Sequence, residues 1–333
     1  EQQISYWQFL AISGIFQIQL GALTSFFNGR GKTYPVMWSS FISTFVNICF
    51  NYCLIFGNFG FPEMGIQGAG LSTLIATFTN VSILSILIFS SKNNQNFNVR
   101  SSYQFNYKRF KRLVNFGMPN GFTFFLNMTV FTVFVLLVGR IGIVELAATN
   151  VAMNIAMLAF MPMIGLGISV MVQVGQSIGA NDPVLAKRAT YTGLQISFMY
   201  LAFLGVFYLF FPQILIYPYQ VNASSNDFDQ IAEMTKIILR FVTVWGFFDA
   251  LGIIISAGLK GAGDTKFIML SVAVIGTFVA AIPAYIAIEI LSWGIYSAFF
   301  IGTIFMATLG ITYLIRFRGG KWQTMKVIET ESN

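Results

Sequence analysis

The chain has 333 residues, of which 56% are hydrophobic and 9% are charged, and its mean hydropathy is +0.72. This composition is typical of a protein embedded in a bilayer and excludes an ordinary soluble domain. The net charge of +7 does not indicate nucleic-acid binding, because that needs a clustered basic face on a soluble fold. The sequence has no histidine, which excludes an imidazole base or a histidine-bound metal.

Apolar segments long enough to cross a hydrocarbon core about 30 Å thick recur along the whole sequence. A transmembrane barrel would instead show alternating segments of about ten residues. We therefore predict an all-α polytopic membrane protein. The predicted spans are 4–26, 35–57, 66–90, 114–139, 146–175, 187–212, 234–258, 267–289 and 291–314.

Basic residues fall in alternate predicted loops. One set of loops carries 16 of the 19 Lys and Arg residues, and nine crossings place all of these loops on the same side. Loops rich in Lys and Arg remain in the cytoplasm. We therefore predict a protein of the plasma membrane, or inner membrane of the cell, with a cytoplasmic C-terminus. The basic loops are 30–32, 92–112, 187–188, 260–266 and 316–326.

Two short motifs occur twice. The sequence Asn-Gly-Arg-Gly-Lys-Thr at 28–33 returns as Lys-Gly-Ala-Gly-Asp-Thr at 260–265, and residues 64–69 resemble 293–298. Predicted spans one to three thus match spans seven to nine. Three further spans precede the second copy and none precedes the first. We therefore expect a six-plus-six, twelve-helix duplication whose first three helices are missing from this chain.

This duplication predicts four regions. Residues 1–91 would form the second half of an N-terminal six-helix lobe, and 92–113 a cytoplasmic linker between lobes. Residues 114–315 would form a C-terminal six-helix lobe, and 316–333 a cytoplasmic tail. Transporters built from parallel repeats bind their substrate between or within the halves.

Asp249 is the only one of the twelve acidic residues that falls deep inside a long apolar segment. An ionisable group at this depth costs roughly 3 kcal/mol or more to insert, and its retention usually indicates ion or substrate handling. A helical rise of 1.5 Å per residue places it about mid-bilayer. The alternative is a structural Asp that hydrogen-bonds a neighbouring helix.

Three segments together carry a family resemblance. They are, in chain order, Asn-Tyr-Cys-Leu-Ile-Phe-Gly at 51–57, the glycine-rich stretch 160–168 that leads into 174–183, and Gly-Ala-Gly-Asp-Thr at 261–265. In this order they resemble multidrug and toxic compound extrusion (MATE) transporters, from the fourth helix to the twelfth. The resemblance implies an antiporter that exports organic, often cationic or hydrophobic, compounds in exchange for Na⁺ or H⁺ by alternation of two lobes. It also implies that Asp249 takes part in cation coupling, as a proton carrier or a Na⁺ ligand.

Asn127 departs from the pattern of the family. Many relatives have Glu at this place, after two phenylalanines, whereas this sequence reads Phe-Phe-Leu-Asn at 124–127. An amide can offer a carbonyl oxygen to Na⁺ but cannot bind and release a proton. We therefore assign Asn127 to ion coupling beside Asp249 and expect Asp249 to carry the protonation chemistry of this lobe.

Other polar and thioether side chains lie inside predicted spans. Such residues face a cavity or another helix, and methionines suit loosely defined apolar substrates. Interhelical hydrogen bonds and ordinary packing are the alternatives. The candidate cavity residues are Asn120, Thr123, Asn150, Asn154, Met153, Met157, Gln17, Asn47 and Asn51.

Other functions find less support. No phosphate-binding loop occurs, and an intramembrane aspartyl protease would need two carboxylates. We therefore predict neither an enzyme nor a cofactor besides the coupling ion. The alternatives are an ion channel and a lipid-linked oligosaccharide flippase of the same superfamily. A flippase would need a cationic group inside the membrane, for which Arg240 is the best candidate. The expected partners are small organic substrates and the bilayer, and the expected state is a monomer.

Overall fold

The computed structural model describes residues 2–101, 104–221 and 228–325, without the side chains of residues 2, 3 and 221. These ranges are helical and contain no strand. Nine of the described helices are long and apolar enough to cross a membrane. The predicted fold class is therefore confirmed. The chain divides into two compact units, Glu1–Asn106 and Tyr107–Asn333, which are described separately.

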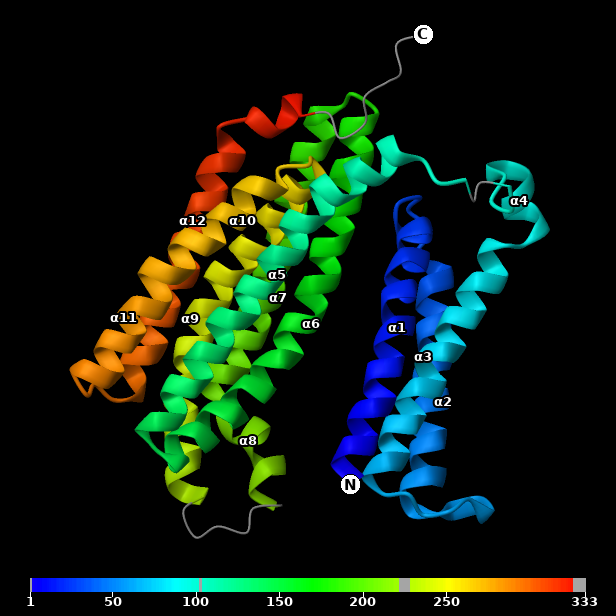
Figure 1. The fold of residues 1–333 in the computed structure, drawn as a ribbon. Coiled ribbons are helices and arrows are strands. Elements are labelled where there is room, and N and C mark those ends of the chain that lie inside the picture. The colour runs from blue at the N-terminus through cyan, green and yellow to red at the C-terminus, as the bar shows by residue number, and fades with distance from the viewer. Residues whose placement is uncertain (1, 102–103, 222–227, 326–333) are drawn as a thin grey trace. The chain divides into compact units, whose positions relative to one another are not determined.

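The N-terminal unit has three membrane-length helices (Figure 1). They are α1 (Gln2–Asn28), α2 (Tyr34–Phe56) and α3 (Ile66–Ile88), followed by the short α4 (Ser91–Phe97). Both α1 and α2 pack against α3. The α2–α3 contact is close, because a Cβ added to Gly68 would lie 2.6 Å from the carbonyl oxygen of Leu54. Small residues of this kind let transmembrane backbones approach one another.

The C-terminal unit is a six-span bundle with one extra short helix (Figure 1). The eighth span consists of α10, a π-helical segment, α11 and a second π-helical segment. The helices are α5 (Tyr107–Ile141), α6 (Ile143–Gly179), α7 (Pro183–Phe210), α8 (Pro212–Val221), α9 (Phe228–Gly261), α10 (Thr265–Ile275), α11 (Ile282–Tyr285) and α12 (Ile295–Arg318).

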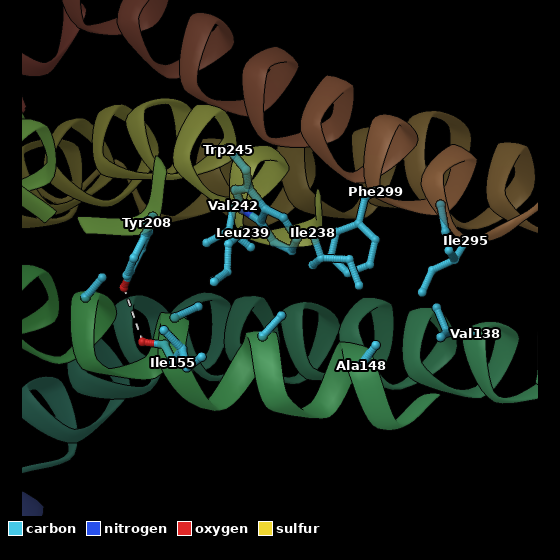
Figure 2. Close-up of a cluster of buried hydrophobic side chains, with 14 of the residues drawn as sticks. Val138, Ala148, Ile155, Tyr208, Ile238, Leu239, Val242, Trp245, Ile295 and Phe299 are labelled. Atoms are coloured by element: carbon cyan, nitrogen blue, oxygen red, sulfur yellow. Dashed lines mark hydrogen bonds between the residues drawn. The ribbon is translucent and has the colours of Figure 1, made fainter. Parts of the chain in front are cut away.

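Helix α9 is the centre of this unit, since it packs against α6, α7 and α12. Ile238 and Leu239 of α9 are fully buried. Figure 2 shows them with Phe299 of α12 in the cluster that joins these helices. The hydroxyl of Tyr208 on α7 donates a hydrogen bond of 3.2 Å to the carbonyl oxygen of Ile155 on α6. The helix that carries Asp249 is thus held on several sides by close packing.

The two copies of the repeated motif form the same turn. Gly31 N donates to the carbonyl oxygen of Asn28, and Gly263 N donates to that of Lys260. Both glycines have positive φ, 68° and 95°, a conformation that glycine adopts without a steric penalty. The turns α1–α2 and α9–α10 therefore correspond, as the sequence repeat predicts.

An ion pair closes the second of these turns. Arg316 Nε at the end of α12 lies 2.7 Å from Asp264 Oδ2, and the Asp264 side chain is only 6% exposed. The Arg316 guanidinium also sits 4.6 Å from the centre of the Phe267 ring. These contacts bind the end of α12 to the α9–α10 turn.

The helix ends differ from the predicted boundaries. Residues 107–113, which we assigned to the linker, are the first turns of α5, and the predicted loop after residue 212 contains α8. The linker also contains most of α4. A helix satisfies its own backbone hydrogen bonds, so it can continue beyond the apolar segment that predicts a span.

Candidate functional site

A cavity of about 570 Å³ lies inside the C-terminal unit. Helices α5, α6, α9 and α12 and the α10–α11 segment line it, mostly with apolar side chains and a few polar ones. Small-molecule sites have volumes of about 300–1,000 Å³ and a similar lining. The cavity is therefore large enough for an organic ligand.

Asp249 of α9 lines this cavity. Its Oδ2 atom is shielded from solvent and has no hydrogen-bond partner among the described residues. Trp245, one turn earlier on α9, also lines the cavity, and its Nε1 is likewise shielded and unpartnered. Buried polar atoms are usually hydrogen-bonded. The α9 wall of the cavity thus contains a buried acceptor and a buried donor that no described residue satisfies.

Helix α5 provides the other predicted polar residues. Asn120, Thr123 and Asn127 all line the same cavity as Asp249. Thr123 is buried, and its hydroxyl donates a 2.7 Å hydrogen bond to the carbonyl oxygen of Pro119. Its proton is therefore used within its own helix, whereas the two amides remain exposed. One carboxylate and these side-chain oxygens could bind a small hard cation, for which oxygen ligands are preferred.

The remaining wall of the cavity is largely apolar. Phe248, Ile253 and Phe305 contribute to it, and Gly252 lies between the polar positions of α9. A Cβ added to Gly252 would meet no atom within 4 Å. Gly252 therefore leaves open space beside Asp249.

Lys260 also lines the cavity, which the sequence analysis did not predict. Arg240, our best candidate for a cationic group inside the membrane, is exposed and does not line the cavity. That choice was wrong, because Arg240 projects from another side of α9. The spacing from Asp249 to Lys260 is close to three helical turns and could have identified the lysine.

The other candidates in this unit lie elsewhere. Asn150, Asn154 and Met157 are exposed on α6 and do not line the cavity. The Asn154 side-chain amide donates a hydrogen bond of 2.9 Å to the backbone carbonyl oxygen of Asn150. Met153 lines a separate space of about 20 Å³ between α6, α7 and α9, which is about the size of one water molecule. Their contact with a substrate stays a prediction.

The candidates in the N-terminal unit form their own group. Asn51 Nδ2 donates to Asn47 Oδ1 at 3.0 Å along α2. Asn51 Oδ1 is shielded and has no partner among the described residues. Gln17 is exposed on α1. No acidic residue occurs within the described spans α1, α2 and α3. The three amides therefore have no carboxylate beside them within these spans.

Among the described residues, no group of three or more His, Cys, Asp or Glu side chains could hold a metal ion. Asp249 is the one carboxylate among the residues that line the described cavity. Any cation bound there would take its charge compensation from Asp249 and its other oxygens from amides, hydroxyls or a ligand.

Comparison with known proteins relates this chain to a family of transporters. The MatE family model matches residues 119–286, half of the chain, which include Asn127 and Asp249. A probable multidrug resistance protein NorM from Bacillus thuringiensis subsp. konkukian is 27% identical over 314 residues, 92% of this chain and 67% of that protein. The NorM protein of Thermotoga maritima is 26% identical over 318 residues, 94% of this chain and 66% of that protein. The chain thus spans about two thirds of these relatives.

Solved structures have the same fold. A multidrug resistance MATE family transporter of the MOP superfamily in its outward-facing conformation superposes with a TM-score of 0.85 at 18% identity, covering 98% of this chain and 70% of that chain. A MATE protein in the bent conformation gives 0.82 at 18% identity, covering 96% and 69%. The nine membrane-length helices of the described residues agree with the family match over half of the chain, and the chain belongs to the MatE family of integral membrane transporters.

Proposed function

We propose that the protein is a cation-coupled antiporter that exports organic compounds, cationic or hydrophobic, by alternating access. The observation that carries this proposal is the unpartnered Asp249 carboxylate in a cavity of about 570 Å³. The names of the NorM relatives, which refer to multidrug resistance, support the same function. The C-terminus is cytoplasmic, and the protein acts as a monomer in the plasma membrane.

The mechanism follows from the cost of a bare charge in the membrane. Asp249 must be neutralised by a proton, by Na⁺ or by a cationic substrate. If these compete for one carboxylate, the arrival of the ion from outside displaces the substrate, and substrate from inside displaces the ion. Asn127 supplies an amide oxygen to Na⁺, and the apolar wall holds the body of the substrate.

Counterflow in proteoliposomes tests this function. Proteoliposomes that contain the full-length protein would be loaded with a fluorescent organic cation. Efflux of this dye would be followed under an inward Na⁺ gradient, an inward H⁺ gradient, or neither. We expect one gradient to accelerate efflux. Efflux equal to that of protein-free liposomes under every gradient would contradict antiport.

A flippase for lipid-linked oligosaccharides is the second candidate, and Lys260 favours it, because an anionic phosphate needs a cationic group in the cavity. The same liposomes, with a fluorescent phosphate-linked isoprenoid in place of the dye, compare the two functions. Scrambling of this lipid without ion-driven dye efflux would favour the flippase.

Asn127→Glu should change the ion dependence of transport. A second carboxylate in the cavity would interact with Asp249, and two such groups split their titrations by about one pH unit or more. We expect the pH profile of efflux to shift by a similar amount, or the apparent Na⁺ affinity to change about tenfold. Asn127→Gln is the matched control, because it keeps the amide. An unchanged pH profile and Na⁺ dependence in a well-expressed Asn127→Glu protein would remove Asn127 from ion coupling.

Gly252→Leu should reduce export of bulky substrates severalfold. A Cβ at this position would meet no atom within 4 Å, so the new side chain would extend into the cavity that Asp249 also lines. Gly165→Leu is the control, since Gly165 on α6 is exposed, has no atom near its added Cβ and does not line the cavity. Dye efflux by the two variants, at matched expression, measures the difference. Equal rates would mean that the substrate does not occupy the space next to Gly252.

A further inference from the structure

Lys260 and Asp249 lie on the same face of α9. They are eleven residues apart, close to three turns, so their Cα atoms are separated by about 16 Å along the helix axis. Both line the same cavity of about 570 Å³. Side chains on a helix lean toward its N-terminus, so both side chains lean the same way and this lean does not bring the two charges together. The lysine is therefore too far away to form an ion pair with this carboxylate.

The carboxylate nearest to Lys260 in the sequence is already bound. Asp264, one turn further on, pairs with Arg316 at 2.7 Å, and Phe267 holds the same guanidinium through a cation–π contact. Among the described residues, Lys260 has no carboxylate within ion-pair distance. It is half-buried. A partly buried ammonium without a counter-ion is costly, and an anion in the cavity would remove this cost.

The wall between the two charges is mostly apolar. Gly252, Ile253, Ser256 and Ala257 of α9 line the cavity between them. The hydroxyl of Ser256 donates to the carbonyl oxygen of Ile253 at 3.1 Å, so its proton is already used within the helix. This stretch therefore offers a ligand mainly van der Waals contact, with an anionic group at one end and a cationic group at the other.

We propose that Lys260 forms an anion subsite, so that the cavity prefers zwitterionic amphiphiles over cations of the same shape. The ammonium of such a ligand faces Asp249, its apolar body lies along Gly252 and Ile253, and its carboxylate faces Lys260. This inference rests on the proposed function, because it assigns the substrate to this cavity. Without the subsite, Lys260 would serve only to keep its loop on the basic side of the membrane.

A pair of dyes that differ in one carboxylate provides the test. Rhodamine B is a zwitterion, and its ethyl ester is a cation with the same ring system. Binding of each dye to the purified full-length protein would be measured by fluorescence anisotropy, and efflux would be measured in proteoliposomes. The variants are Lys260→Gln, which removes the charge, and Lys260→Arg, which keeps it. Lys266→Gln is the control, because Lys266 is exposed and does not line the cavity.

We expect Lys260→Gln to lower the ratio of rhodamine B affinity to ester affinity about tenfold or more, and Lys260→Arg to retain most of that ratio. Lys266→Gln should match the wild type for both dyes. An unchanged ratio in Lys260→Gln, with ester efflux still driven by an ion gradient, would overturn the subsite and leave the antiport proposal intact. A wild-type protein that binds and exports neither dye would overturn both proposals.

Discussion

Asp249→Asn should abolish gradient-driven efflux while the protein still inserts and folds. The substitution keeps the size of the side chain and its capacity for hydrogen bonds but removes the charge that a proton, Na⁺ or a cationic substrate must neutralise. It also replaces an unpartnered carboxylate oxygen with a neutral amide, whose burial costs less than that of a charge, so folding should not suffer. We expect ion-driven efflux to fall to the level of protein-free liposomes.

The matched control for this change is Asp229→Asn. Asp229 lies in the first turn of the same helix and is exposed, so its loss should leave efflux and ion dependence unchanged. Surface expression and detergent-solubilised yield of both variants would be compared with the wild type. If Asp249→Asn exported substrate at the wild-type rate with the same ion dependence, the carboxylate would have only a structural role.

Of the substitutions proposed for this protein, Arg316→Gln should lower the free energy of unfolding most. The change leaves Asp264, 6% exposed, as an uncompensated charge at the α9–α10 turn. Breaking a buried ion pair on one side costs about 3–5 kcal/mol. The variant also loses the cation–π contact with Phe267. Thermal unfolding in detergent, followed by tryptophan fluorescence, should show a clearly lowered midpoint.

Two further variants separate the ion pair from a general effect of removing arginine. Arg318→Gln removes an exposed arginine two residues later and should hardly change the midpoint, since surface charges contribute little. The double variant Asp264→Asn/Arg316→Gln should recover part of the loss, because no unpaired charge then remains. If Arg316→Gln and Arg318→Gln unfolded at the same temperature, the Asp264–Arg316 pair would not stabilise the turn.

The described cavity explains why the site was only partly predictable. Asp249 could be recognised from the sequence, because a carboxylate inside a long apolar segment is costly wherever the helices pack. Asn120, Thr123 and Asn127 share one helix face, and the structure places them in the same cavity as Asp249. The amides of α6 have the same local pattern but lie outside this cavity. Periodicity defines a face of a helix, whereas the neighbour of that face depends on long-range packing.

The sequence alone determined the helical class, the number of predicted spans and the correspondence of the two glycine turns. Burial of the backbone in lipid requires helices of a minimum length, and the positive φ in each turn favours glycine. Only the tertiary structure decided that Lys260, and not Arg240, lines the cavity, and that Arg316 forms an ion pair with Asp264. Both outcomes depend on how α9 is rotated against its neighbours and on where α12 ends, and packing of the whole unit sets that rotation.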